Sequence, residues 1–290
     1  MEQIIIHFTK NEREDRIITY EFTRHEEICC YFACMIRMVA TIFSFMAISI
    51  SILFATHSFT ITSTQNEINP FTYNRLIIDS SITKAFVMGK FLPQTHIRFQ
   101  RVPDPLCSKS MYLQKEVVAS FQRMQSAAMA EGISLKIISG TRNFWEQRNI
   151  WERKWNANLQ RWGATAKNAR EILKYSSMPS SSRHHWGTDI DINNLSPSYF
   201  SAGQGLKELQ WLRKNAGNFG FVEVYSPRAT GRVTGYEPEA WHWSYAPLST
   251  QYLDFYKQHV GYGDFQGFSG CQWAQELRII EDFVGGVSNK

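Results

Sequence analysis

The chain has 290 residues and a formal net charge of +5, with 43% hydrophobic and 20% charged residues. These proportions are ordinary for a globular protein, and the length allows one large domain or two small ones. The modest basic excess suits an anionic partner, but no run of Lys and Arg and no nucleic-acid motif occurs, so we expect no nucleic-acid partner. Five Cys without paired C-x-x-C motifs argue against a Cys-rich structural zinc site.

The first feature along the chain is an uncharged apolar run, residues 39–55, which follows a mixed and charged segment, residues 1–37. The run is at the short limit for a membrane span and slightly long for the apolar core of a signal peptide. Read from Met35, a short basic start leads into it, as in a secretory signal. We therefore expect residues 38–56 to be a signal peptide or membrane anchor that contacts the membrane if it is not cleaved.

The remainder divides into a polar linker, residues 57–83, and a folded domain, residues 84–290, which we expect in the periplasm or cell envelope. Hydrophobic periodicity predicts an α+β domain, in which helices flank a small antiparallel sheet. The expected helices span residues 112–131, 144–173, 206–215, 251–260 and 272–283. The expected strands span residues 134–139, 188–193, 221–225 and 241–245. Asn143, with Glu146 three residues on, is expected to cap the second helix.

Two stretches of this domain bring together residues that suit a catalytic zinc site. Such a site takes three protein ligands and leaves one position for water. His184, Asp191 and His242 supply two imidazoles and a carboxylate, and Glu239 is left as a base. Since Glu239 and His242 would point to opposite faces of one strand, Pro238 is expected to place Glu239 in the turn before it.

Strand 188–193 alternates between acidic and Ile residues, so we expect its Ile face to be buried and its acidic face to be open. Asp189 and Asp191 share that acidic face. Asp191 is the candidate metal ligand, and Asp189 is expected to hold a ligand histidine.

These stretches resemble the zinc D-alanyl-D-alanine carboxypeptidase and dipeptidase family, which includes the VanY-like vancomycin-resistance peptidases and is related to lysostaphin and hedgehog domains. The family patterns are S-x-H-x-x-G-x-A-x-D and E-x-W-H, and the chain departs from them only in having Asp189 where the family has Ala. The matching residues are Ser182, His184, Gly187, Asp191, Glu239, Trp241 and His242.

The resemblance continues upstream, where Ser139, Gly140, Arg142 and Gln147 match a family element, S-G-x-R-x-x-x-x-Q, in which the Arg and Gln contact substrate. By this resemblance, one zinc ion is held by His184, Asp191 and His242. Glu239 is the general base, Arg142 stabilises the oxyanion, and Arg142, Gln147 and Ser182 bind substrate.

The implied activity is that of a zinc metallopeptidase, a D-alanyl-D-alanine carboxypeptidase or dipeptidase that acts on peptidoglycan stem peptides. Two alternatives keep the same fold: an endopeptidase that cuts between L-Ala and D-Glu, and a non-catalytic zinc-bound module that binds the cell wall. A third is a serine hydrolase that uses Ser81 and Lys84 of an S-x-x-K pattern. Export would also allow Cys107 and Cys271 to form a disulfide.

Overall fold

The computed structural model describes residues 82–288 of the chain. The apolar segment at residues 38–56, most of the expected linker and Ser81 lie outside the described residues. Within them, no helix combines the length and the apolar character that crossing a membrane requires. Lys84, the lysine of the S-x-x-K pattern, forms a salt bridge with Asp264 (Nζ–Oδ2 2.9 Å).

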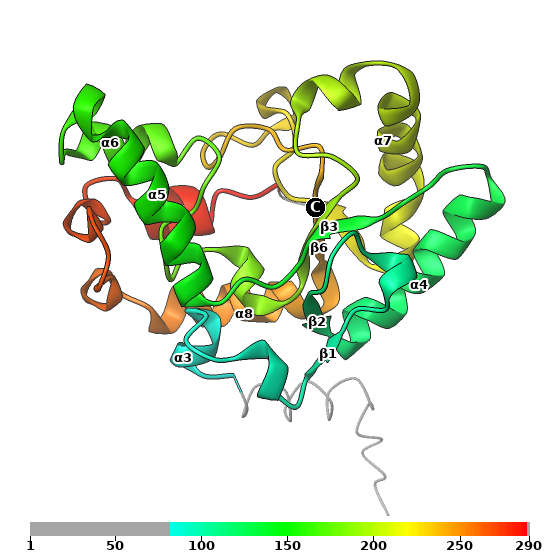
Figure 1. Cartoon of the computed structure of the whole chain (residues 1–290), viewed down its shortest axis with the longest axis horizontal. Coiled ribbons are helices and arrows are strands. Elements are labelled where there is room, and N and C mark those ends of the chain that lie inside the picture. Colours follow the sequence, from blue (N-terminus) through cyan, green and yellow to red (C-terminus); the bar gives the residue numbers. More distant parts are fainter. Residues whose placement is uncertain (1–81, 289–290) are drawn as a thin grey trace, which may run out of the picture. The chain divides into compact units, whose positions relative to one another are not determined.

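The centre of the domain is a four-stranded antiparallel sheet in the order β3-β4-β6-β5, which confirms the predicted α+β class (Figure 1). Its strands are β3 (Ile137–Ser139), β4 (Asp189–Ile192), β5 (Phe221–Glu223) and β6 (His242–Tyr245). A separate antiparallel ribbon pairs β1 (Phe99–Arg101) with β2 (Tyr112–Gln114). The prediction of a helix from residue 112 is therefore wrong at its start, because residues 112–114 pair with β1 before the helix begins.

Helices lie on two sides of these strands: α4 and α7 on one, and α5 with α6 on the other (Figure 1). The helices are α3 (Lys84–Val87), α4 (Lys115–Ala130), α5 (Phe144–Trp162), α6 (Ala166–Ile172), α7 (Gly203–Asn215) and α8 (Ala246–His259). One contiguous hydrophobic core joins the helices to the sheet, and its largest fully buried side chains include Trp151, Trp186, Trp243 and Phe121.

Helix α5 begins at the capping box that the sequence predicts. The Asn143 side chain accepts a hydrogen bond from the Glu146 backbone N–H (2.9 Å), and the Glu146 carboxylate accepts one from the Asn143 N–H (2.8 Å). The prediction of one continuous helix to residue 173 is wrong, because the chain turns at Gly163 (φ +62°) and restarts as α6. Glycine adopts this positive φ without steric cost because it has no Cβ.

The C-terminal segment, residues 260–288, is the least regular part of the domain. The predicted helix at residues 272–283 is wrong: a 3₁₀ turn (Cys271–Trp273) and a π-helix (Ile279–Val284) stand in its place. Arg278, with φ 52°, interrupts the helical path between them. Cys107 and Cys271 are free thiols, so the expected disulfide between them is also wrong.

Two of the hydrogen bonds that attach this C-terminal segment reach different parts of the domain. The Trp151 indole N–H of α5 donates to the Ser269 carbonyl (2.8 Å). The Ser288 N–H donates to the Val224 carbonyl (2.9 Å), directly after β5. The segment therefore connects one flanking helix to the far edge of the sheet.

The capping box predicts a specific loss of stability. Asn143→Ala removes the acceptor of an N-terminal N–H of α5 and should lower the free energy of unfolding by about 1 kcal/mol, within ~0.5–2 kcal/mol. Chemical denaturation of the folded domain measures this. The matched control is Asn156→Ala, at an exposed position inside the same helix, where the change should be neutral or slightly stabilising. Equal destabilisation by both variants would contradict the capping role.

Candidate active site

The register between β4 and β6 sets the geometry of the site. Asp191 lies opposite His242, and Asp189 lies opposite Ser244. Directly opposed residues of an antiparallel pair have their side chains on the same face and within contact distance. The pairing therefore places both acidic side chains of β4 beside the two polar side chains of β6.

His184 reaches the same place from a 3₁₀ turn, Arg183–Trp186, that directly precedes β4. Gly187 ends this turn in the left-handed conformation (φ +68°), and a Cβ atom there would lie 2.3 Å from the Phe99 ring. Only glycine satisfies both constraints, so Gly187 allows the tight passage from turn to strand.

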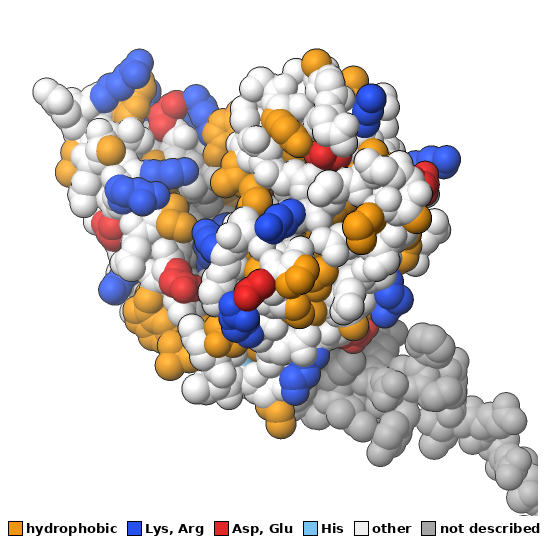
Figure 2. Space-filling model, turned by 45° about the vertical axis from the view of Figure 1, so that its right-hand side comes forward, with side chains coloured by type: hydrophobic (Ala, Val, Ile, Leu, Met, Phe, Trp, Pro, Cys, Tyr) orange, Lys and Arg blue, Asp and Glu red, His pale blue; other side chains and the backbone are white. Residues whose placement is uncertain are grey.

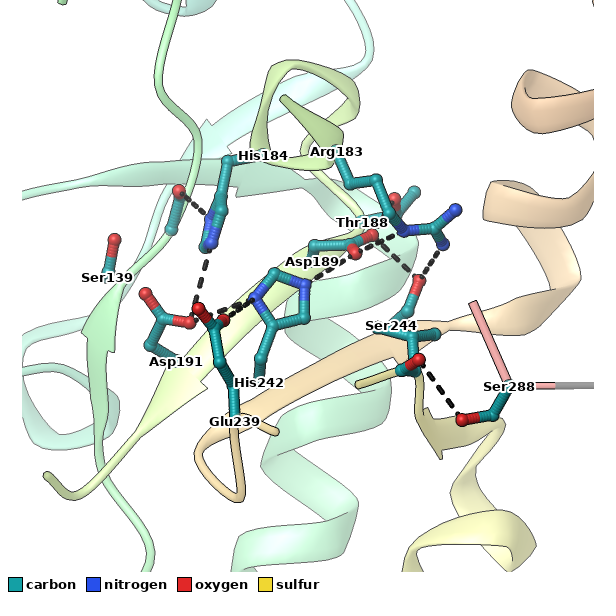
Figure 3. A network of polar contacts seen from close by, with 12 residues as sticks. Ser139, Arg183, His184, Thr188, Asp189, Asp191, Glu239, His242, Ser244 and Ser288 are labelled. Carbon is teal, nitrogen blue, oxygen red and sulfur yellow. Dashed lines mark hydrogen bonds and ion pairs between the residues drawn. The ribbon is translucent and has the colours of Figure 1, made fainter. Parts of the chain in front are cut away.

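The two imidazoles converge on one oxygen of Asp191 (Figure 3). His184 Nε2 lies 3.4 Å from Asp191 Oδ1, and His242 Nδ1 lies 3.2 Å from the same atom. The other nitrogen of each ring makes a hydrogen bond away from Asp191. His184 Nδ1 donates to the Gly140 carbonyl (2.8 Å), and His242 Nε2 donates to Asp189 Oδ2 (2.9 Å). Each ring therefore directs its remaining nitrogen at Asp191.

This donor set fits a divalent metal ion. One ligand atom from each of His184, Asp191 and His242 lies within 4.8 Å of the others, and all three side chains are buried. Asp191 Oδ1 is buried and has no hydrogen-bond partner among the described residues. Burial lowers the pKa of His242, but Asp189 and Asp191 outweigh it and raise that pKa to about 9. Two imidazoles with one carboxylate are a ligand set for zinc.

Asp189 is the centre of a buried polar network on the far side of the His242 ring (Figure 3). Its carboxylate accepts hydrogen bonds from Arg183 Nε (2.8 Å), Thr188 Oγ1 (2.8 Å) and Ser244 Oγ (2.7 Å), besides that from His242. Burial raises the pKa of Asp189, but Arg183 and His242 outweigh it and hold the pKa well below its usual range. A carboxylate that receives the second N–H of a ligand histidine fixes the orientation and tautomer of the ring.

The acidic face of β4 is thus covered, and the expectation that it is open is wrong. All four residues of β4 are buried. The Ile side chains enter the core, while Arg183 and His242 pack over Asp189 and Asp191 on the other face. Sequence reasoning missed Arg183. The available signal was Asp189 itself, because a buried carboxylate needs a cationic partner and Arg183 is close in sequence.

Glu239 lies in the turn before β6, as Pro238 predicts, since β6 begins only at His242. Its backbone N–H donates to the Tyr225 carbonyl (3.0 Å), which anchors the turn. Its carboxylate reaches back to 3.6 Å (Oε2) from His242 Nδ1. Burial raises the pKa of Glu239 to about 7, although His242 lowers it. A carboxylate of this kind can both accept and release a proton near neutral pH.

Arg142 extends its guanidinium from the loop after β3 toward Asp191 (Nη1–Oδ2 3.8 Å). Its Nε donates to Gln147 Oε1 (3.1 Å) and its Nη1 to Ser139 Oγ (2.7 Å). The Gln147 amide is buried and also donates to the Ser177 carbonyl (2.8 Å). In this structure Gln147 therefore orients Arg142, and its direct contact with substrate stays a prediction.

The backbone of Arg142 is held by the two adjacent histidines. Its N–H donates to the His184 carbonyl (3.2 Å), and its carbonyl accepts from His185 Nδ1 (2.6 Å). Burial lowers the pKa of His185 to about 3, so the ring is a neutral donor. Sequence reasoning gave His185 no role. Ser182 is buried nearby with a hydroxyl that has no partner among the described residues, and its substrate contact stays a prediction.

Comparisons with known proteins show which chains this domain is similar to. Residues 110–248 match the family described as D-alanyl-D-alanine carboxypeptidase, VanY. A protein of Enterococcus faecalis (strain ATCC 700802 / V583) named D-alanyl-D-alanine carboxypeptidase is 32% identical over 128 residues, 44% of this chain and 46% of its own. YodJ of Bacillus subtilis (strain 168), provisionally named a carboxypeptidase, is 29% identical over 140 residues, 46% of each chain. The chain thus spans about half the length of these curated relatives.

Among solved structures, VanYB in complex with D-alanine-D-alanine is 23% identical to this chain, with a TM-score of 0.43. The match covers 58% of this chain and 86% of that one.

The network around Asp189 predicts that one substitution lowers both the stability of the domain and its affinity for metal, and that the two effects can be separated. Asp189→Ala leaves the buried Arg183 guanidinium unpaired and should lower the free energy of unfolding by about 3–5 kcal/mol. It also removes the acceptor of the His242 N–H and should weaken metal binding about 10- to 100-fold. Denaturant unfolding and competition with a chromogenic chelator measure the two effects.

A double variant, Arg183→Met with Asp189→Ala, serves as the matched control. It removes both buried charges, so much of the stability should return while metal binding stays weak. Recovery of both properties together would contradict a direct role of Asp189 in orienting His242.

Proposed function

Residues 110–248 belong to the VanY-like family of D-alanyl-D-alanine carboxypeptidases, and on this premise we propose that the protein is a zinc-dependent carboxypeptidase. Its proposed substrates are peptidoglycan stem peptides, from which it removes the terminal D-alanine. Such peptides lie outside the cytoplasmic membrane, so the proposal includes export, for which residues 38–56 are the candidate segment.

One observation carries the proposal: two imidazole nitrogens and an unpartnered carboxylate oxygen face one another beside a second, protonatable carboxylate. His184, Asp191 and His242 would hold the metal ion. When bound, zinc supplies a Lewis acid that polarises a carbonyl and lowers the pKa of water toward ~7.

Glu239 is placed to move the proton. Its carboxylate lies next to His242, on the same side of the ring as Asp191 (Figure 3). Because burial raises its pKa to about 7, Glu239 can accept a proton from the attacking water and then donate it to the leaving amine. The anchored turn fixes the carboxylate, so little reorganisation is needed between these two transfers.

Arg142 supplies the cation of the site. Its side chain is 26% exposed, whereas Asp191 beside it is buried, so the guanidinium is within reach of a ligand. Gln147 and Ser139 fix the plane of the guanidinium, which can bind a carboxylate through two parallel hydrogen bonds. A free terminal carboxylate gives this group a charged partner and an internal peptide bond does not, which favours a carboxypeptidase over an endopeptidase.

The roles of Glu239 and His242 predict a clean separation between metal binding and turnover. Glu239→Ala should keep its metal but lose D-alanine release by about 10²-fold or more, because no group remains to move the proton. His242→Ala should lose metal as well as activity. Elemental analysis and an assay of released D-alanine measure the two properties. Full metal content in His242→Ala, or near-normal turnover in Glu239→Ala, would refute the assignment.

The role of Arg142 predicts how the enzyme discriminates at the substrate's C-terminus. Amidating the terminal carboxylate should cost the wild type about 2–3 kcal/mol in kcat/KM, or roughly 30- to 150-fold, as for a charge-assisted hydrogen bond. Arg142→Ala should distinguish the two peptides much less. Equal cleavage of free and amidated peptides by the wild type would contradict the clamp and favour the endopeptidase alternative.

A further inference from the structure

The last described residues pack against the loop that leads to Glu239, although they lie outside the family match, which ends at residue 248. We call residues 279–288 the C-terminal strap; it consists of the π-helix Ile279–Val284 and the four residues after it. Helices of this type are rare and occur frequently at functional sites. Figure 2 shows Lys and Arg side chains interspersed with carboxylates and apolar groups on one face of the molecule, so charge marks no docking surface there. What distinguishes the strap is its packing inside the domain.

The backbone of the strap is in tight contact with the loop of residues 226–238. A Cβ atom on Gly235 would lie 2.4 Å from the Gly286 carbonyl oxygen, and one on Gly286 would lie 2.8 Å from the Gly235 backbone nitrogen. Only glycine therefore fits on either side of this contact. Near the other end of the loop, the Ser288 N–H donates to the Val224 carbonyl (2.9 Å), and the hydroxyl groups of Ser226 and Ser288 share a hydrogen bond (2.6 Å; Figure 3). The strap thus holds the loop at both ends.

Aromatic rings extend this contact to the active site. The Phe283 ring lies 5.2 Å from the Tyr236 ring, centroid to centroid, and the Tyr236 ring lies 5.1 Å from that of Tyr225. Both pairs are edge-to-face, a favoured aromatic geometry. The Tyr225 ring in turn lies 4.6 Å from the His242 imidazole, and the Tyr225 carbonyl accepts the Glu239 N–H. Because close-packed interiors transmit displacements, a shift of the Phe283 ring reaches the residues that meet the reacting groups.

Tyr236 is also close to Glu239 along the chain. Only two residues separate them, and one is Pro238, whose ring fixes its own φ. The buried Arg232 guanidinium holds the preceding turn, since its Nη1 donates to the carbonyls of Tyr236 (2.7 Å) and Thr234 (2.6 Å). A displacement of Tyr236 is therefore passed on to Glu239, because the loop has little freedom to absorb it.

We propose that Phe283 is a positioning residue for proton transfer: by packing on Tyr236, it holds Glu239 in the place where its carboxylate faces His242. This inference rests on the proposed function, in which Glu239 moves the proton. It assigns a task in the reaction to a segment that follows the matched family region.

The strap should govern the rate of the chemical step and leave recognition of the substrate's C-terminus unchanged. Arg142, the group proposed to bind the terminal carboxylate, is held by Ser139 and Gln147, which belong to β3 and α5. Loss of the strap contact therefore predicts a lower kcat with the same KM, whereas partial unfolding would lower the amount of active enzyme whichever residue is changed.

The test compares two phenylalanines that both follow residue 248 and are both partly buried against the core. Phe283→Ala removes the ring on Tyr236 and should lower kcat of the zinc-loaded enzyme about tenfold or more, with KM and the preference for free over amidated peptides unchanged. Phe283→Tyr keeps the ring and should retain most of the rate. The matched control is Phe255→Ala, which removes a ring that stacks on His259 of α8 and should behave as the wild type.

Two kinetic results would overturn the positioning role. The first is an equal loss of kcat in Phe255→Ala, which would show a general effect of lost packing. The second is an equal fold-loss from Phe283→Ala in the wild type and in Glu239→Ala, because a residue that acts through Glu239 has no effect left once that carboxylate is gone. If Phe283→Ala does not fold, Phe283→Leu, which keeps an apolar side chain without the ring, takes its place.

Amide hydrogen exchange of the zinc-loaded full chain separates this inference from the proposed function. The Glu239 N–H, which is bonded to the Tyr225 carbonyl, should exchange about tenfold faster in Phe283→Ala and at the wild-type rate in Phe255→Ala. If this result is found while the wild type releases no D-alanine, the positioning of Glu239 stands and the proposed activity falls. Unchanged exchange in Phe283→Ala would overturn the positioning role even in an active enzyme.

Discussion

The pairing of β4 with β6 is the constraint on which the site depends. With Asp191 opposite His242 and Asp189 opposite Ser244, the two carboxylates of β4 face two polar side chains of β6 across the ladder. Side chains alternate between the faces of a strand, so a slip by one residue would turn the whole set to the other face. If β6 slipped, Trp243 would face the site, and the core would have to bury the polar side chains of His242 and Ser244. Because that arrangement is so costly, the register that assembles the site is also the one that folds the sheet.

The second constraint is the buried charge of Asp189. A carboxylate in this position is tolerated because Arg183 enters from the preceding turn and two hydroxyl groups complete its hydrogen bonds. The same carboxylate holds the outer nitrogen of His242. Asp189 therefore links the turn that carries His184, through Arg183, to the strand that carries His242, through the imidazole N–H. The polar contacts of this carboxylate thus add to packing in orienting the site.

The parts of this structure that the sequence predicts are those that depend on local chemistry. Asn143 and Glu146 cap α5 through contacts within one turn, and Pro238 places Glu239 outside β6. The convergence of His184, Asp191 and His242 was predicted because a recognisable spacing accompanies it. The β1–β2 ribbon, the break at Gly163 and the π-helix at Ile279–Val284 were missed, because distant pairing or a single backbone conformation decides them. Arg183 was missed for a related reason: its role depends on the burial of its guanidinium beside Asp189, and the sequence alone shows burial poorly.

The C-terminal segment has a consequence for the dimensions of the site. One of its hydrogen bonds holds α5, the helix of Gln147, and another holds the chain just after β5, next to the Tyr225 carbonyl that anchors Glu239. Both attachments lie outside the residues that would meet a substrate. Insertions or deletions between Ser269 and Ser288 would shift α5 relative to the turn that carries Glu239 while leaving every reacting group intact. Homologues that differ only in this stretch would therefore share one chemistry yet sort their substrates by size.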